Sequence, residues 1–203
     1  MNYIWDLDGT LIDSYDGILK SLMDLLDYFN LKMKKDDVYK YIIKNSVHDF
    51  LIDLSNDYFI DLLKIQNKYA EFRLETLNLV SLNSNAYEAL KYLYDKGNNL
   101  FVFTHKGLST YDILKRFNID KFFKEIITSN NNFKRKPDPE AINYIINKYN
   151  LKKEDTFYIG DRPIDMLCAK NANIKGILLK NDLIDIEIDA YKKINNLIEL
   201  KEE

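Results

Sequence analysis

Two carboxylates stand two positions apart near the start of the chain, where a short apolar run gives way to a turn. Asp6 and Asp8 follow the apolar residues 3–5, and Gly9 comes next. Side chains at positions i and i+2 of a strand project to the same side, so both carboxylates can converge on one reacting group where the strand stops. Asp-Gly is also an ordinary turn signal, and aspartates at strand ends are often only solvated, so the pair alone leaves catalysis and a turn as alternatives.

Polar segments also follow three later apolar runs of the chain. They are residues 104–107 after the run 100–103, residues 134–140 after 125–128, and residues 160–165 after 156–159. All three prolines lie inside these segments, where they rigidify the loops or begin the next helix. Ligands of open α/β sheets bind beyond the carboxyl ends of the strands, so the sequence predicts one site assembled from four strand ends.

The elements that must position this site follow an α/β rhythm. The apolar runs are short enough for buried parallel strands, and a further strand is expected at 176–179. From residue 85 on, the runs are separated by segments of helical period, at 86–94, 109–117 and 139–149. This alternation predicts a doubly wound parallel sheet in an α/β core domain made of residues 1–13 and 85–203.

Residues 14–84 break that rhythm. Apolar residues recur there at helical spacing, for example at Ile18, Leu22 and Leu25 and again between Phe59 and Tyr69. The stretch contains one glycine and no proline, which favours a compact bundle over a flexible linker. We therefore expect an inserted α-helical domain at 14–84.

Composition and charge narrow the class of partner. The chain has 203 residues, of which 46% are hydrophobic and 30% charged, and its formal net charge is −3. Without an overall basic field, neither nucleic acid nor an anionic membrane is expected as a partner, and a small molecule is favoured. The chain begins without a basic leader segment, and no apolar run approaches the roughly 20 residues that span a bilayer, so we expect a cytoplasmic location. Cys168 is the only cysteine, which excludes an internal disulfide and predicts a packing role.

Taken together, the four segments resemble the signature motifs of the haloacid dehalogenase (HAD) superfamily of phosphohydrolases. The chain carries, in order, Asp-Leu-Asp-Gly-Thr, a Thr that ends the second strand, Lys-Pro-Asp-Pro-Glu, and Gly-Asp-x-x-x-Asp. The helical insertion is similar to the cap of the branch that includes phosphoglycolate phosphatase and β-phosphoglucomutase. The resemblance implies a Rossmann-like core, with residues 14–84 as a mobile cap domain.

The resemblance also implies roles for the acidic residues. Asp6 would be the nucleophile that forms an aspartyl-phosphate, and Asp8 would be the general acid and then the base. The implied cofactor is Mg²⁺, held by Asp6, the backbone carbonyl of Asp8 and Asp161. Asp165 would bind at the periphery of the metal or orient one of its ligands, with a simple interaction with the helix dipole as the alternative.

Phosphate binding is expected from basic and hydroxyl groups on the side of the site away from the metal. Lys136 would balance the phosphate charge, and Thr104 would donate its hydroxyl. His105 stands where many relatives have Asn or Ser, and we expect its backbone N–H to serve the phosphate in preference to a dedicated catalytic imidazole. The neighbours Lys134 and Arg135 fit an exposed basic rim better than a place in the site.

Specificity is expected to reside in the cap domain. The candidates share a polar stretch at a helix junction: Lys44, Asn45, Ser46 and His48. Ser46 has an equally good alternative as a helix N-cap, with Asp49 three residues later. Arg162, inside the fourth motif, would contact the substrate or the cap domain, or pair with a surface acid.

The function expected from these residues is hydrolysis of a small phosphomonoester, either phosphoglycolate-like or a sugar phosphate, by a Mg²⁺-dependent phosphatase. A phosphomutase similar to β-phosphoglucomutase would use the same residues, and a non-catalytic binding protein with this fold is a third alternative. A dehalogenase is disfavoured, because its chemistry calls for neither Asp8 nor the metal site. The partner is therefore a small phosphorylated metabolite, and the oligomeric state, monomer or homodimer, is left open.

Overall fold

The computed structural model describes residues 1–180 and 188–202, which form two compact units. The first consists of Met1–Ile12 and Leu82–Glu203, and the second of Asp13–Ser81. The predicted core range 85–203 includes residues 181–187 and 203, which lie outside the described residues. The chain crosses between the units at β2 (Ile12–Asp13) and β3 (Ser81–Leu82), which pair in a two-stranded sheet.

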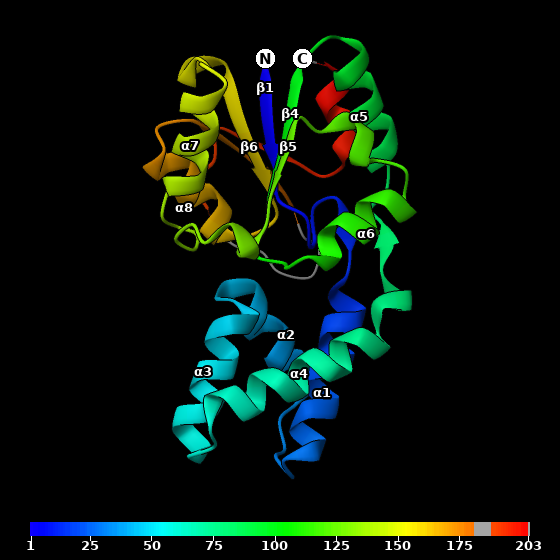
Figure 1. The fold of residues 1–203 in the computed structure, drawn as a ribbon, viewed down its shortest axis with the longest axis vertical. Coiled ribbons are helices and arrows are strands. Elements are labelled where there is room, and N and C mark those ends of the chain that lie inside the picture. Colours follow the sequence, from blue (N-terminus) through cyan, green and yellow to red (C-terminus); the bar gives the residue numbers. More distant parts are fainter. Residues whose placement is uncertain (181–187, 203) are drawn as a thin grey trace. The chain divides into compact units, whose positions relative to one another are not determined.

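A parallel sheet forms the centre of the first unit, as predicted, and Figure 1 shows it between layers of helices. Within the described residues it has six strands, in the order β5-β4-β1-β6-β7-β8. Their bounds are β1 (Asn2–Trp5), β4 (Asn99–Phe103), β5 (Glu125–Ile127), β6 (Thr156–Gly160), β7 (Lys175–Leu179) and β8 (Lys192–Ile194). The short edge strand β8 was not predicted, because two of its three residues are lysines and it lacks an apolar run.

Helices cover both faces of this sheet. The described residues of the unit form the α-helices α5 (Ala86–Asp95), α6 (Ser109–Arg116), α7 (Glu140–Lys148) and α8 (Pro163–Asn171). They also form the 3₁₀ helices η2 (Asp120–Phe122), η3 (Ser129–Asn131), η4 (Lys153–Asp155) and η5 (Leu197–Glu202). Figure 1 shows α7 and α8 on one face and α5 on the other. Ile4, Phe101 and Tyr158 of the strands pack with Ile142 of α7 and Cys168 of α8 in one buried cluster. Burial of such side chains, at about 1.5–3 kcal/mol each, is the main force that holds strand and helix together. Cys168 has the packing role that was expected.

Asparagines end several helices by adopting the left-handed conformation. Their backbone φ values are positive, and their N–H groups donate to carbonyls of the last helical turn: Asn30 after α1, Asn118 after α6, Asn150 after α7 and Asn173 after α8. Gly97 ends α5 in the same way, with φ of 76°. Asparagine is the residue after glycine that best tolerates this conformation, so it sharpens helix ends in a chain with only six glycines.

The second unit is a bundle of helices, α1 (Tyr15–Tyr28), α2 (Lys35–Lys44), α3 (Val47–Tyr58) and α4 (Leu62–Glu75), followed by the 3₁₀ helix η1 (Leu77–Leu79). Leu22, Leu26 and Ile42 lie in its buried core. The expected apolar stripe from Phe59 on is wrong in part: Phe59 ends α3 in the left-handed conformation and is 95% exposed, and Leu63 is also exposed. Among the described residues, no helix is both long enough and apolar enough to cross a bilayer.

Candidate active site

The turn after β1 separates the two leading carboxylates. The Leu7 carbonyl accepts hydrogen bonds from the backbone N–H groups of residues 10, 11 and 12, and Gly9 has a φ of 83° that a residue with a side chain rarely adopts. Asn83 donates its side-chain amide to the carbonyls of Gly9 and Thr10, at 3.1 and 3.0 Å. The turn is therefore held in one shape, with Asp6 buried and Asp8 partly exposed.

Three buried carboxylates meet at the ends of β1 and β6. Asp6, Asp161 and Asp165 each offer an oxygen, and these oxygens lie within 4.8 Å of one another. The Thr10 hydroxyl donates to Asp161 Oδ1 at 3.0 Å, which orients that carboxylate. A compact set of carboxylate oxygens suits a hard divalent cation such as Mg²⁺ or Ca²⁺ better than a soft transition metal.

Asp165 enters the cluster because Gly160 leaves room for it. A Cβ on Gly160 would lie 2.4 Å from the Cβ of Asp165, a distance that real atoms do not show. Pro163 begins α8, as predicted, and this places Asp165 in the first helical turn. There Asp165 Oδ2 accepts the backbone N–H of Arg162 at 3.2 Å, while its Oδ1 faces the cluster. Asp165 thus caps the helix and also belongs to the acidic cluster.

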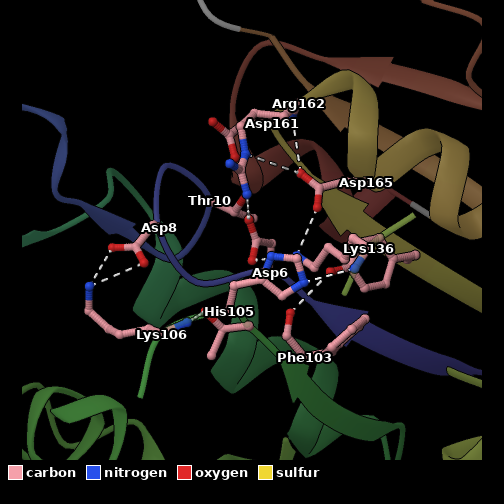
Figure 2. A network of polar contacts seen from close by, with 12 residues as sticks. Asp6, Asp8, Thr10, Phe103, His105, Lys106, Lys136, Asp161, Arg162 and Asp165 are labelled. Atoms are coloured by element: carbon pink, nitrogen blue, oxygen red, sulfur yellow. Dashed lines mark hydrogen bonds and ion pairs between the residues drawn. The ribbon is translucent and has the colours of Figure 1, made fainter. Parts of the chain in front are cut away.

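Lys136 links two of these carboxylates from the loop after β5. Its Nζ lies 2.7 Å from Asp6 Oδ1 and 2.8 Å from Asp165 Oδ1, and its side chain is completely buried (Figure 2). The rings of Phe103 and Tyr158 flank the ammonium, each with its centroid 5.2 Å away. Buried charges of this kind persist only when they are paired, and here two ion pairs and two aromatic faces replace water.

Burial and neighbouring charges together shift the pKa values of Asp6 and Lys136. Burial raises the pKa of the Asp6 carboxyl above its usual range, and the Lys136 ammonium opposes that rise. For Lys136, burial by itself lowers the pKa, but attraction by Asp165 and Asp6 outweighs it and the pKa is raised. Lys136 therefore keeps its positive charge at neutral pH. Arg162 adds a second cation, with its guanidinium 3.5 Å from Asp6 Oδ2.

Asp8 is not part of the acidic cluster. Both of its carboxylate oxygens accept hydrogen bonds from Lys106 Nζ, at 2.9 and 3.2 Å, and Figure 2 shows this pair apart from Asp6. No role was predicted for Lys106 from the sequence. The available signal was its place in the polar segment after β4, but the partner of a long flexible side chain cannot be read from position alone.

Thr104 and His105 form the turn after β4. The Thr104 hydroxyl accepts the backbone N–H of Lys106 at 3.1 Å, and a hydroxyl that accepts one bond can still donate another. His105 does more than offer its backbone N–H, since its Nε2 accepts the backbone N–H of Lys136 at 2.8 Å. The imidazole thus contacts the loop that carries Lys136, which neither sequence-based alternative for His105 included.

The remaining basic residues divide between the site and the surface. Lys134 and Arg135 are exposed, as expected of a basic rim, and Lys134 lies 3.7 Å from Asp138. The Arg162 guanidinium lies beside the buried Asp6 and Asp165. Only 13% of its side chain is exposed.

The four candidate specificity residues lie in the unit Asp13–Ser81, at the junction of α2 and α3. Lys44 is the last residue of α2 and is exposed, and Asn45 and His48 are half-buried. Ser46 is the N-cap of α3: its hydroxyl oxygen accepts the backbone N–H of Asp49 at 3.1 Å. The capping alternative therefore accounts for Ser46, while a part for the four residues in substrate recognition stays a prediction.

Replacing Ser46 by Ala separates these two roles. We expect the substitution to cost about 1 kcal/mol of stability, because the Asp49 N–H loses its acceptor, and to leave KM for substrate unchanged. Thermal unfolding and steady-state kinetics measure the two effects. Ser46→Asn is the matched control, since asparagine also caps helices well. A KM that rises in both variants would instead assign Ser46 to substrate recognition.

Comparisons with known proteins give a family match and similar folds. The sequence profile of the haloacid dehalogenase-like hydrolases matches residues 3–179. A pyrophosphatase, PpaX, of Bacillus mycoides is 29% identical over 93% of this chain and 88% of its own length. The crystal structure of a hydrolase from Streptococcus pneumoniae is 29% identical, with a TM-score of 0.60 over 86% of this chain and 90% of that one. A predicted phosphoglycolate phosphatase from Haemophilus somnus shares the fold, with a TM-score of 0.85, 20% identity, and coverage of 99% and 96% of the two chains.

Proposed function

The chain belongs to the haloacid dehalogenase-like hydrolase family, and we propose that it is a Mg²⁺-dependent phosphatase that hydrolyses small phosphomonoesters through an aspartyl-phosphate. The observation that carries the proposal is the buried Asp6 carboxylate with Lys136 Nζ at 2.7 Å, at the strand end where Asp161 and Asp165 also meet. A carboxylate held beside fixed cations can face a dianionic phosphate, since the cations reduce the repulsion between the two anions.

In the first step of the proposed reaction, an Asp6 oxygen forms a bond to phosphorus and the bond from phosphorus to the ester oxygen breaks. Asp8 gives a proton to the departing alkoxide. In the second step a water oxygen attacks phosphorus, Asp8 takes the proton, and orthophosphate leaves as Asp6 is restored. In the structure Lys106 Nζ pairs with Asp8, which places a positive charge beside the carboxyl group that would give and take this proton.

Asp6, Asp161 and Asp165 are the carboxylates that fit a bound Mg²⁺, and the backbone carbonyl of Asp8 is a further proposed ligand. The carboxylate oxygens are close together and buried, and they are of the type that this ion prefers. Bound there, the ion would offset negative charge on the phosphate oxygens. Thr10 would support the site by holding Asp161, since residues that orient metal ligands commonly change metal affinity about 10- to 100-fold when removed.

The proposal extends to the class of substrate. Phosphoglycolate-like and sugar phosphates are the first candidates, and the relatives named pyrophosphatases add inorganic pyrophosphate. The leaving group of pyrophosphate is itself an anion. Asp8 would protonate this leaving group, and Lys106, which pairs with Asp8, places a positive charge beside it. We assign the helical residues 14–84 as the cap domain, with Lys44, Asn45, Ser46 and His48 as candidates for substrate recognition.

Phosphate release from a panel of these compounds tests the proposal. Release is expected with Mg²⁺ and not with EDTA, and restoring Mg²⁺ after EDTA should restore the rate. An isomerised sugar phosphate without free phosphate would point to a mutase. Absence of turnover across the panel, with a folded protein, would contradict the phosphatase assignment.

A further inference from the structure

His105 is a half-buried residue whose side chain has no part in the proposed reaction steps. Its Nε2 lies 2.8 Å from the backbone nitrogen of Lys136, and its ring meets Phe103 edge-on, with the centroids 5.8 Å apart. A backbone N–H always donates, so Nε2 must be the unprotonated nitrogen of the imidazole. This hydrogen bond joins the turn after β4 to the loop after β5, 31 residues further along the chain.

The contact falls on the residue whose position matters most in that loop. Residues 132–139 form neither helix nor strand, and a turn hydrogen bond from the Asp138 N–H to the Arg135 carbonyl, at 3.0 Å, spans Lys136. Lys136 Nζ nevertheless lies within hydrogen-bond distance of both Asp6 and Asp165, at 2.7 and 2.8 Å. A shift of the Lys136 backbone would be passed along the side chain to these distances.

A second hydrogen bond also holds the backbone of this loop. The Pro137 carbonyl accepts the side-chain amide of Asn171, at the end of α8, at 2.9 Å, but that contact is exposed. The His105 contact is half-buried and acts on the residue that carries the ammonium. Of these two links, His105 has the more direct hold on Lys136.

We infer that His105 is a positioning residue of this site, which uses its imidazole Nε2 to hold the Lys136 backbone so that the ammonium faces Asp6 and the bound phosphate. The inference rests on the proposed phosphatase function. It differs from proton transfer by the imidazole, because the Nε2 lone pair is already used by the Lys136 N–H. It also differs from a role for the His105 backbone alone, which any side chain at this position would preserve.

Two amide substitutions test the inference, because they place their oxygens differently. In His105→Gln the amide oxygen reaches about as far from the backbone as Nε2 and can accept the Lys136 N–H. In His105→Asn the oxygen is at the place of Nδ1 and falls short. Misplacing a catalytic group by about 1 Å commonly costs 10²-fold, so we expect kcat/KM to fall 10- to 100-fold in the Asn variant and about 3-fold or less in the Gln variant.

The inhibition constant of orthophosphate is a second measurement. A general loss of stability would not change this constant in one variant and leave it unchanged in the other. The inhibition constant should rise in His105→Asn and stay near the wild-type value in His105→Gln, with similar melting temperatures for the two variants. Equal, near-wild-type kinetics in both would overturn the inference in favour of the backbone alone. Equal losses in both would overturn it in favour of the imidazole ring itself. Failure of the phosphatase function would be seen separately, as an inactive wild-type protein.

Discussion

Replacing Asp6 by Asn is expected to lower the rate of phosphate release at least about 10³-fold, because an amide oxygen is too weak a nucleophile to form the acyl phosphate. The change keeps the size of the side chain, and Lys136 keeps its ion pair with Asp165 at 2.8 Å. The fold should therefore survive the loss of activity. Rates with saturating substrate and Mg²⁺, together with circular dichroism, measure both expectations.

Trapping the phosphorylated protein identifies the nucleophile more directly. Acid quenching of the wild-type enzyme during turnover should yield a phosphorylated protein by mass spectrometry, and the Asp6→Asn variant should yield none. Asp112→Asn is a matched control, since Asp112 is an exposed aspartate on α6 and the same chemical change there should leave the rate unaltered. Phosphoprotein in the Asp6→Asn sample, or a rate close to the wild type, would show that another residue is the nucleophile.

The location of the cluster was predictable because it depends on local patterns. A short apolar run that ends in polar residues predicts a strand end, and parallel strands bring their carboxyl ends to one edge of the sheet. The segments that carry Asp6, Lys136 and Asp161 could be placed together on that basis, and the resemblance to the family motifs selected these residues within them. The helix start at Pro163 was equally predictable, because proline is favoured in the first turn of a helix.

The contacts within the cluster were not predictable, because they depend on side-chain rotamers and on loops that meet in space. Nothing in the sequence of residues 104–107 indicates that Lys106 pairs with Asp8 or that the His105 imidazole accepts a hydrogen bond from the Lys136 backbone. The same limit applies to Phe59, whose apolar side chain indicated burial but whose backbone adopts the left-handed conformation at the end of α3. Tertiary context overrides single-residue preference in each case.

Replacing Lys136 by Met should have the largest effect on stability of any single change in the site. The methionine fills similar space between Phe103 and Tyr158, but it leaves the Asp6 and Asp165 carboxylates buried, with the Arg162 guanidinium beside them and no ammonium between them. Removing one partner of a buried ion pair commonly costs about 3–5 kcal/mol. At roughly 2–4 °C per kcal/mol for a chain of this size, the metal-free protein should melt about 10 °C lower.

Lys134→Met is the matched control for that experiment, because Lys134 is exposed two positions earlier in the same loop and its loss should cost within about 0.5 kcal/mol. Adding Asp165→Asn to the Lys136→Met variant removes one of the uncompensated charges, so it should recover part of the lost stability without restoring activity. Mg²⁺ should likewise raise the melting temperature of the Lys136→Met variant more than that of the wild type, since a bound cation replaces the missing positive charge. If both lysine variants melted at the same temperature, Lys136 would not be the cation that compensates these carboxylates, and its place opposite the nucleophile would need a different explanation.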